Sequence, residues 1–175
     1  FFGSSGSDTL NGDGTTGTDG IDKVDYTNIN KKIVLTTAAG TTNYSIAKYE
    51  ETTLLGTDST TKVEIIQGGS ADDTFTGGSL ADTFLAGLGN DTISGGLGDD
   101  SLDGGSNVDT VTYSYTSFNT TIDLHNQSAT VSVSSGSDTD SITSFENVIG
   151  GSGNDTIKMG EDNVTNTIDG GDGNS

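Results

Sequence analysis

The sequence contains no cysteine, no proline and no tryptophan among its 175 residues. Without cysteine the chain has neither a disulfide framework nor a thiolate metal site. The absence of proline is compatible with β-strand ladders, in which each backbone N–H is needed as a donor. No stretch approaches the roughly 18 consecutive apolar residues of a membrane span. We therefore expect no membrane insertion.

Basic and apolar residues are also scarce. The chain has 6 Lys and Arg against 26 Asp and Glu, which gives a formal net charge of −20 at pH 7. Such self-repulsion opposes compaction, so we expect folding to require cations. The same charge argues against nucleic acid as a partner, because binding to phosphates needs lysine and arginine. A hydrophobic content of 29% excludes a thick apolar core.

A nine-residue period fills the middle of the chain. Residues 68–112 divide into the units GGSADDTFT, GGSLADTFL, AGLGNDTIS, GGLGDDSLD and GGSNVDTVT. The eighth place of each unit is a large apolar residue, and the sixth place is always aspartate. These aspartates are Asp73, Asp82, Asp91, Asp100 and Asp109. The pattern is G-G-x-G-x-D-x-U-x, which is typical of calcium-binding parallel β-helix repeats.

The spacing has a physical reason. Calcium prefers about six to eight oxygen ligands, more than one short turn supplies. Two units would form one coil of 18 residues, which places Asp73 below Asp91 and Asp91 below Asp109 on one edge. Asp82 would lie below Asp100 on the opposite edge. Stacked strands are about 4.8 Å apart, a distance that a calcium ion can bridge. Glycines at the first, second and fourth places permit tight turns and positive φ, so that backbone carbonyls can also face the ion.

Weaker copies of the unit flank this block. They are GSSGSDTLN at residues 3–11, GTDGIDKVD at 17–25 and GGSGNDTIK at 150–158, with Asp8, Asp22 and Asp155 in the sixth place. Further toward the C-terminus, Asn166 and Ser175 stand where aspartate is expected.

A longer repeat contains these units. GIDKVDYTN (20–28) aligns with NVDTVTYSY (107–115), and TDSTTKVEIIQGG (57–69) aligns with TDSITSFENVIGG (139–151). We predict three segments. They are 1–67, a first short repeat block plus a β-rich insert; 68–149, a central β-roll block (68–112) plus a second β-rich insert; and 150–175, the truncated start of a further block. The apolar Ile21 and Val108, just before each insert, are expected to be covered by insert side chains.

The nonapeptides and the phrase FENVIGGSGNDTI (145–157) resemble those of the RTX, or haemolysin-type calcium-binding, proteins. The resemblance implies an all-β fold: a right-handed parallel β-roll of two short-stranded sheets with glycine-rich calcium-binding turns, interrupted here by β-rich inserts. It also implies type I secretion from a Gram-negative bacterium and folding on meeting calcium outside the cell.

The resemblance implies a set of calcium ligands. The carboxylate ligands are Asp73, Asp82, Asp91, Asp100, Asp109 and Asp155, followed by Asp8 and Asp22. Carbonyl ligands come from the glycines of the same turns, namely Gly69, Gly87, Gly89, Gly96, Gly98, Gly151 and Gly153. Several calcium ions are therefore expected.

Catalysis is not expected. A catalytic carboxylate pair would be singular, whereas these aspartates are periodic, and no Ser–His–Asp arrangement can be assembled around the single His125. We predict a calcium-folded structural segment of a large secreted or surface-attached bacterial protein of adhesin, filament or S-layer type. Its partners would be calcium ions, and copies of itself or neighbouring modules. The alternative is a C-terminal accessory or secretion module of a secreted enzyme such as an alginate epimerase, lipase or protease. A third class is a polysaccharide-binding module that uses the insert surfaces.

Overall fold

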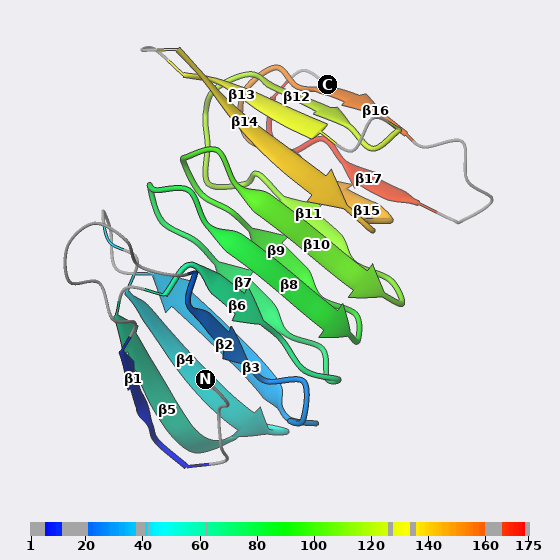
Figure 1. Ribbon diagram of the computed structural model, residues 1–175. Coiled ribbons are helices and arrows are strands. Elements are labelled where there is room, and N and C mark those ends of the chain that lie inside the picture. Colours follow the sequence, from blue (N-terminus) through cyan, green and yellow to red (C-terminus); the bar gives the residue numbers. More distant parts are fainter. Residues whose placement is uncertain are drawn as a thin grey trace.

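The computed structural model describes residues 6–11, 21–37, 41, 43–61, 63–125, 128–133, 136–159 and 166–173. These residues form strands and turns, with no helix among them. The described part therefore contains no helix that could cross a membrane. The strands lie in two sheets that form the two layers of an elongated roll (Figure 1).

The strands of the two sheets interleave along the chain. In sheet order, the nine-stranded sheet consists of β1 (Thr9–Asn11), β5 (Thr53–Thr61), β4 (Tyr44–Glu50), β3 (Lys32–Thr37), β7 (Thr74–Thr76), β9 (Thr92–Ser94), β11 (Thr110–Thr112), β15 (Asn147–Ile149) and β17 (Thr167–Asp169). The eight-stranded sheet consists of β16 (Thr156–Lys158), β12 (Thr120–Asp123), β13 (Ser128–Val133), β14 (Gly136–Thr143), β10 (Ser101–Ser106), β8 (Thr83–Leu88), β6 (Ile65–Gln67) and β2 (Lys23–Asp25).

The nonapeptide block forms the parallel β-roll that the sequence predicts. Each unit contributes one short strand, and successive strands alternate between the two sheets. Thr74 pairs with Thr92, and Thr92 with Thr110, in one sheet, while Thr83 pairs with Ser101 in the other. All these pairs are parallel and 18 residues apart in sequence. The predicted stacking of alternate units is therefore confirmed.

The core of the roll is thin, because each unit buries only one large side chain. The eighth-place residues point inward, since neighbouring residues of a strand face opposite sides of a sheet. They are Phe75, Phe84, Ile93, Leu102 and Val111, each at most 1% exposed. The rings of Phe75 and Phe84 meet edge to face across the core, with centroids 5.5 Å apart. Each such side chain contributes about 1.5–3 kcal/mol of hydrophobic stabilisation, so a roll of this kind needs a further source of stability.

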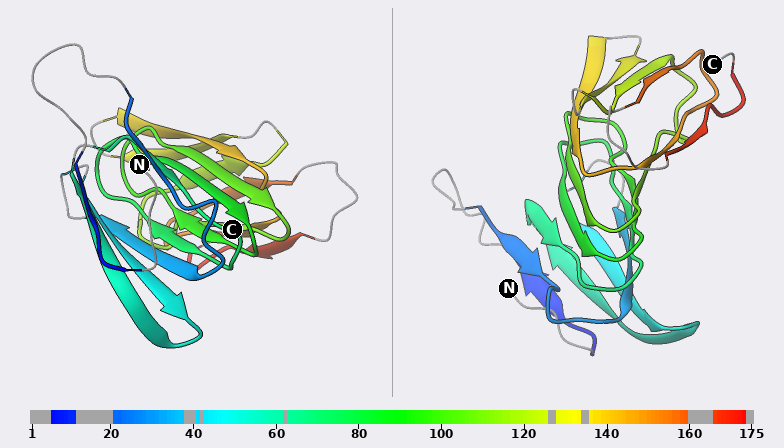
Figure 2. Two further views of the ribbon diagram at one scale, coloured as in Figure 1. Left: turned by 60° about the horizontal axis from the view of Figure 1, so that its bottom comes forward. Right: turned by 90° about the vertical axis from the view of Figure 1, so that its right-hand side faces the viewer.

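Each insert adds antiparallel strands to one sheet only. Strands β3, β4 and β5 extend the nine-stranded sheet, and β12, β13 and β14 extend the eight-stranded sheet. Beside the first insert, the other sheet continues directly from β2 to β6, and beside the second it continues from β11 to β15. Each insert adds three strands to one sheet and none to the other. The two layers therefore diverge toward both ends of the roll (Figure 2).

The inserts do not cover the apolar residues that precede them. Ile21 is 76% exposed and Val108 is 46% exposed, so the expectation that insert side chains cover them was wrong. The reason is that the insert strands pair edge to edge with the roll and lengthen its sheets, and do not fold over its turns.

Candidate metal site in the stacked turns

The turns between the sheets bring the predicted aspartates into two rows. The turns at residues 68–73, 86–91 and 104–109 follow one another along one edge, and those at 77–82 and 95–100 along the opposite edge. All five sixth-place aspartates are buried, with at most 3% of each residue exposed. Buried carboxylates are rare unless they are paired or bind a metal.

Backbone hydrogen bonds connect the aspartates within each row. The N–H of Asp73 donates to Oδ1 of Asp91 (2.7 Å), and the N–H of Asp91 donates to Oδ1 of Asp109 (2.8 Å). On the opposite edge, the N–H of Asp82 donates to Oδ1 of Asp100 (2.8 Å). One carboxylate oxygen of Asp91, of Asp100 and of Asp109 therefore holds adjacent coils together.

The second carboxylate oxygen divides the turns into two kinds. In the first two turns, Oδ2 of Asp73 and of Asp82 accepts the N–H of the glycine four residues earlier, at 3.1 and 3.0 Å. In the next three turns, Oδ2 of Asp91, Asp100 and Asp109 is buried and has no hydrogen-bond partner. An unpaired buried carboxylate oxygen is costly, so these three turns are suited to bind a cation.

A backbone difference accounts for the two kinds of turn. The second-place glycines Gly87, Gly96 and Gly105 have φ of +112°, +101° and +99°, a conformation that residues with a side chain rarely adopt. In these turns the glycine N–H does not reach the aspartate. The fourth-place residues Gly89 and Gly98 also have positive φ, at +124° and +113°.

Three of the predicted glycine ligands differ from the others in backbone conformation. Gly69, Gly151 and Gly153 do not have positive φ, so the expectation of this conformation fails for them. A Cβ at Gly69 would lie 2.2 Å from the carbonyl oxygen of Ile29, and one at Gly151 would lie 2.4 Å from that of Thr116. The close approach of an insert backbone excludes a side chain at these positions.

Backbone carbonyls line the edge beside the unpaired carboxylate oxygens. A Cβ at Gly105 would lie 2.2 Å from the carbonyl oxygen of Gly87, and one at Gly87 would lie 2.6 Å from that of Gly69. Within the described ranges, no three Asp, Glu, His or Cys side chains gather at one point. A cation here would therefore take carbonyl as well as carboxylate oxygens, a mixture that suits calcium.

The buried aspartates are electrostatically uncompensated. Burial raises the pKa of Asp73 and of Asp91 to about 7, and that of Asp100 to about 8. Neighbouring carboxylates raise the pKa of Asp91 and Asp100 further. Burial likewise raises the pKa of Asp109 to about 6. A divalent cation would favour the charged form of all four.

The outlying predicted ligands lie apart from these rows. Asp155 is buried and resembles Asp73, because its Oδ1 accepts the N–H of Thr120 and its Oδ2 that of Gly151, both at 2.8 Å. Asp8 and Asp22 are only partly buried. Their roles as ligands stay predictions.

Four acidic residues of the inserts accept the backbone N–H of a predicted aspartate, and none of the four was among the predicted ligands. Asp140 on β14 accepts the N–H of Asp100 through Oδ1 at 3.0 Å, and Asp58 on β5 accepts that of Asp8 at 2.8 Å. Glu146 accepts the N–H of Asp109 and Glu64 that of Asp22, both at 2.8 Å. The signal was in the longer repeat, which aligns Asp58 with Asp140 and Glu64 with Glu146.

The metal-free chain should lose stability as the pH rises from about 5 to about 8. The buried aspartates have folded-state pKa values of about 6 to 8, above the ordinary value of 3.8. Between these values the folded state binds more protons than the unfolded state, so the free energy of unfolding falls as the pH rises. The folded fraction in EDTA at fixed ionic strength, followed by far-ultraviolet circular dichroism, would measure this trend.

Saturating calcium should reverse the trend, because the metal binds deprotonated carboxylates. As a control, Asp100→Asn should flatten the metal-free profile above pH 6, because it removes the carboxyl with a pKa of about 8. A metal-free folded fraction that does not fall as the pH rises would contradict the assignment of these aspartates as uncompensated.

A comparison with protein families matches the RTX calcium-binding nonapeptide repeat in four copies, at residues 1–15, 60–79, 65–84 and 76–111. These segments contain both rows of buried aspartates. No curated protein matches the sequence. Such calcium-binding repeats occur in secreted bacterial proteins, which indicates an extracellular setting. Residues 1–15 and 60–111 of the chain therefore carry RTX calcium-binding nonapeptide repeats.

Proposed function

We propose that the chain is a calcium-folded, non-enzymatic structural segment of a large secreted or cell-surface bacterial protein of adhesin, filament or S-layer type. The observation that carries the proposal is the set of buried, unpartnered carboxylate oxygens on Asp91, Asp100 and Asp109, in stacked glycine turns. The net charge of −20 supports it, because bound cations would relieve the self-repulsion that opposes folding.

The proposed ligands follow from the geometry of the turns. Asp91, Asp100 and Asp109 would each give Oδ2 to a calcium ion, while their Oδ1 atoms keep the hydrogen bonds between coils. Asp73 and Asp82 lie in the neighbouring turns and would contribute to the same rows. The remaining ligands would be carbonyl oxygens of the glycine turns, so one ion joins two coils. Several ions per chain follow from two rows of turns.

The arrangement of the sheets supports a role as one module among several. In the described part, β1 and β17 end one sheet, and β16 and β2 end the other, so each pairs on one side only. Edge strands present unpaired N–H and C=O groups to which a further strand can be added. A neighbouring repeat block, or another copy of the chain, could extend both sheets along the axis of the roll. A stiff, extended spacer of this kind suits a surface protein.

Purified chain in millimolar calcium should show no turnover of alginate, ester or peptide substrates. The reason is that its buried carboxylates form periodic rows and not a singular catalytic pair. Turnover above the rate of a buffer blank, abolished by a single substitution that leaves the circular dichroism spectrum in calcium unchanged, would contradict a purely structural role.

A further inference from the structure

The two inserts meet the repeats at equivalent junctions. At the first junction the last insert strand, β5, pairs in parallel with β1, and Ser59 stands beside Thr9. At the second junction β14 pairs in parallel with β10, and Ser141 stands beside Ser101. In both cases an insert strand occupies the place of the next repeat coil.

The same hydrogen bonds hold both junctions. Oδ1 of Asp58 accepts the N–H of Asp8 at the first, and Oδ1 of Asp140 accepts the N–H of Asp100 at the second. Oδ2 of Asp58 accepts the hydroxyl of Tyr26 at 2.6 Å, and Oδ2 of Asp140 accepts that of Tyr113 at 2.8 Å. The two junctions can therefore be compared residue by residue.

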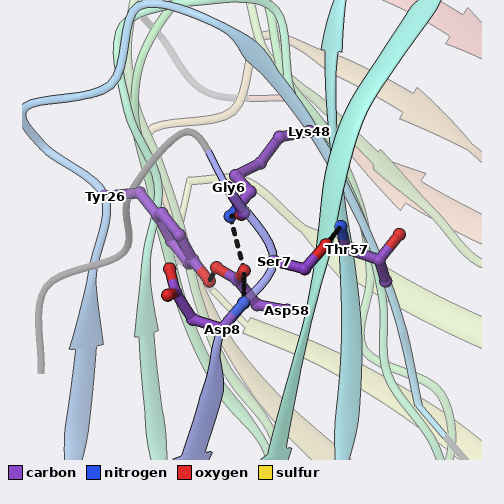
Figure 3. A network of polar contacts seen from close by, with 7 residues as sticks. All are labelled: Gly6, Ser7, Asp8, Tyr26, Lys48, Thr57 and Asp58. Carbon is purple, nitrogen blue, oxygen red and sulfur yellow. Dashed lines mark hydrogen bonds and ion pairs between the residues drawn. The ribbon is translucent and has the colours of Figure 1, made fainter.

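A lysine ammonium lies within the first junction. Lys48 is fully buried, and its Nζ donates to Oδ1 of Asp58 and to the carbonyl oxygen of Gly6 (Figure 3). Lys48 stands opposite Gly56 on the paired strands β4 and β5. A Cβ at Gly56 would lie 2.8 Å from the carbonyl oxygen of Gly6, which leaves no room for a side chain there. One cation thus bridges a turn carbonyl and an insert carboxylate.

The second junction has one more carboxylate and no lysine. By strand register, Val131 takes the place of Lys48, and Asp138 takes the place of Gly56. The sequence has no Lys or Arg between Lys62 and Lys158. The junction therefore has Asp138 in addition to Asp100 and Asp140, and no basic residue from its own insert.

Two carboxylate oxygens of this junction are without partners. Oδ2 of Asp138 accepts the N–H of Gly98 at 3.1 Å, which fixes the side chain beside the fourth-place glycine of the turn at 95–100. Oδ1 of Asp138 is buried with no hydrogen-bond partner, and so is Oδ2 of Asp100. Both residues are more than nine-tenths buried.

We propose that the second junction is a calcium site outside the nonapeptide pattern, built from Asp138, Asp100 and carbonyl oxygens of the turn at 95–100, and that the Lys48 ammonium replaces this ion at the first junction. Calcium suits the second junction, because its ligands are carboxylate and carbonyl oxygens. An ammonium suits the first, because it offers three N–H donors to a smaller set of oxygens. This inference rests on the proposal that the chain folds with calcium.

The test is a calcium count by equilibrium dialysis of the whole chain at saturating calcium. Asp138→Asn should lower the count by one and raise the calcium midpoint of folding severalfold, while its amide oxygen still accepts the Gly98 N–H. The matched control is Asp99→Asn, which removes an exposed charge next to Asp100 and keeps an acceptor for the N–H of Thr139. It should leave the count unchanged. An unchanged count in Asp138→Asn would overturn the inference.

An exchange of the two junctions tests the inference independently if Asp138→Asn folds poorly. The double variant Val131→Lys/Asp138→Gly gives the second junction the residues of the first, so it should fold with one calcium ion fewer than the wild type. An unchanged count in this variant, or a failure to fold at any calcium concentration, would also overturn it. A wild-type chain that binds no calcium would instead contradict the proposed function.

Discussion

Chelation of calcium with EDTA at neutral pH should unfold most of the chain, and millimolar calcium should restore the β-structure in one cooperative transition. The thin core and the net charge of −20 leave the metal-free roll with little to oppose self-repulsion. Metal that binds only the folded state stabilises it by about 2.7 kcal/mol per site at one hundred times the dissociation constant. Three such sites together contribute about 8 kcal/mol, which is comparable to the roughly 5–15 kcal/mol stability of an ordinary domain.

Far-ultraviolet circular dichroism during a calcium titration would measure this transition. Magnesium at the same ionic strength is the control, because it screens charge equally but prefers a smaller octahedral shell of oxygens. It should restore far less structure than calcium. Equal β-structure in EDTA and in calcium, or full recovery in magnesium, would contradict calcium-coupled folding.

Replacement of Asp91 should raise the calcium midpoint of folding more than replacement of either neighbour in its row. Asp91 lies between the turns of Asp73 and Asp109. Its Oδ1 accepts the N–H of Asp73, and its own N–H donates to Oδ1 of Asp109. Its unpartnered Oδ2 can therefore serve ions on both sides. Asp73 already uses both carboxylate oxygens in hydrogen bonds, and Asp109 is followed by Glu146 in place of another glycine turn.

Calcium titrations of Asp91→Ala, Asp73→Ala and Asp109→Ala would measure this order. Asp91→Asn is the matched control for the lost hydrogen bond, because its amide oxygen can still accept the N–H of Asp73 while the negative charge is gone. If loss of a calcium ligand is the cause, Asp91→Asn should shift the midpoint nearly as far as Asp91→Ala. Equal midpoints for the three alanine variants would show that Asp91 does not serve two sites.

Much of the fold could be predicted from the period of the sequence. A nine-residue unit with one apolar residue has one residue to bury and one turn to make, so two units close a coil and alternate units stack. The buried Phe75 and Phe84 on opposite sheets, and the pairing of Thr74 with Thr92, follow from that period alone. The rows of aspartates follow for the same reason.

Tertiary structure decided what the period leaves open. Gly69 and Gly87 occupy the same place in their units, yet only Gly87 has positive φ, because the turn of Gly69 stacks against the Ile29 carbonyl of an insert. Likewise, nothing in the local sequence shows that Val131 and Asp138 take the places of Lys48 and Gly56. Strand register between distant segments sets that equivalence. Local repeats determine the coil and its turns. Long-range pairing determines in which turns the second aspartate oxygen has a hydrogen-bond partner and in which it is left for a cation.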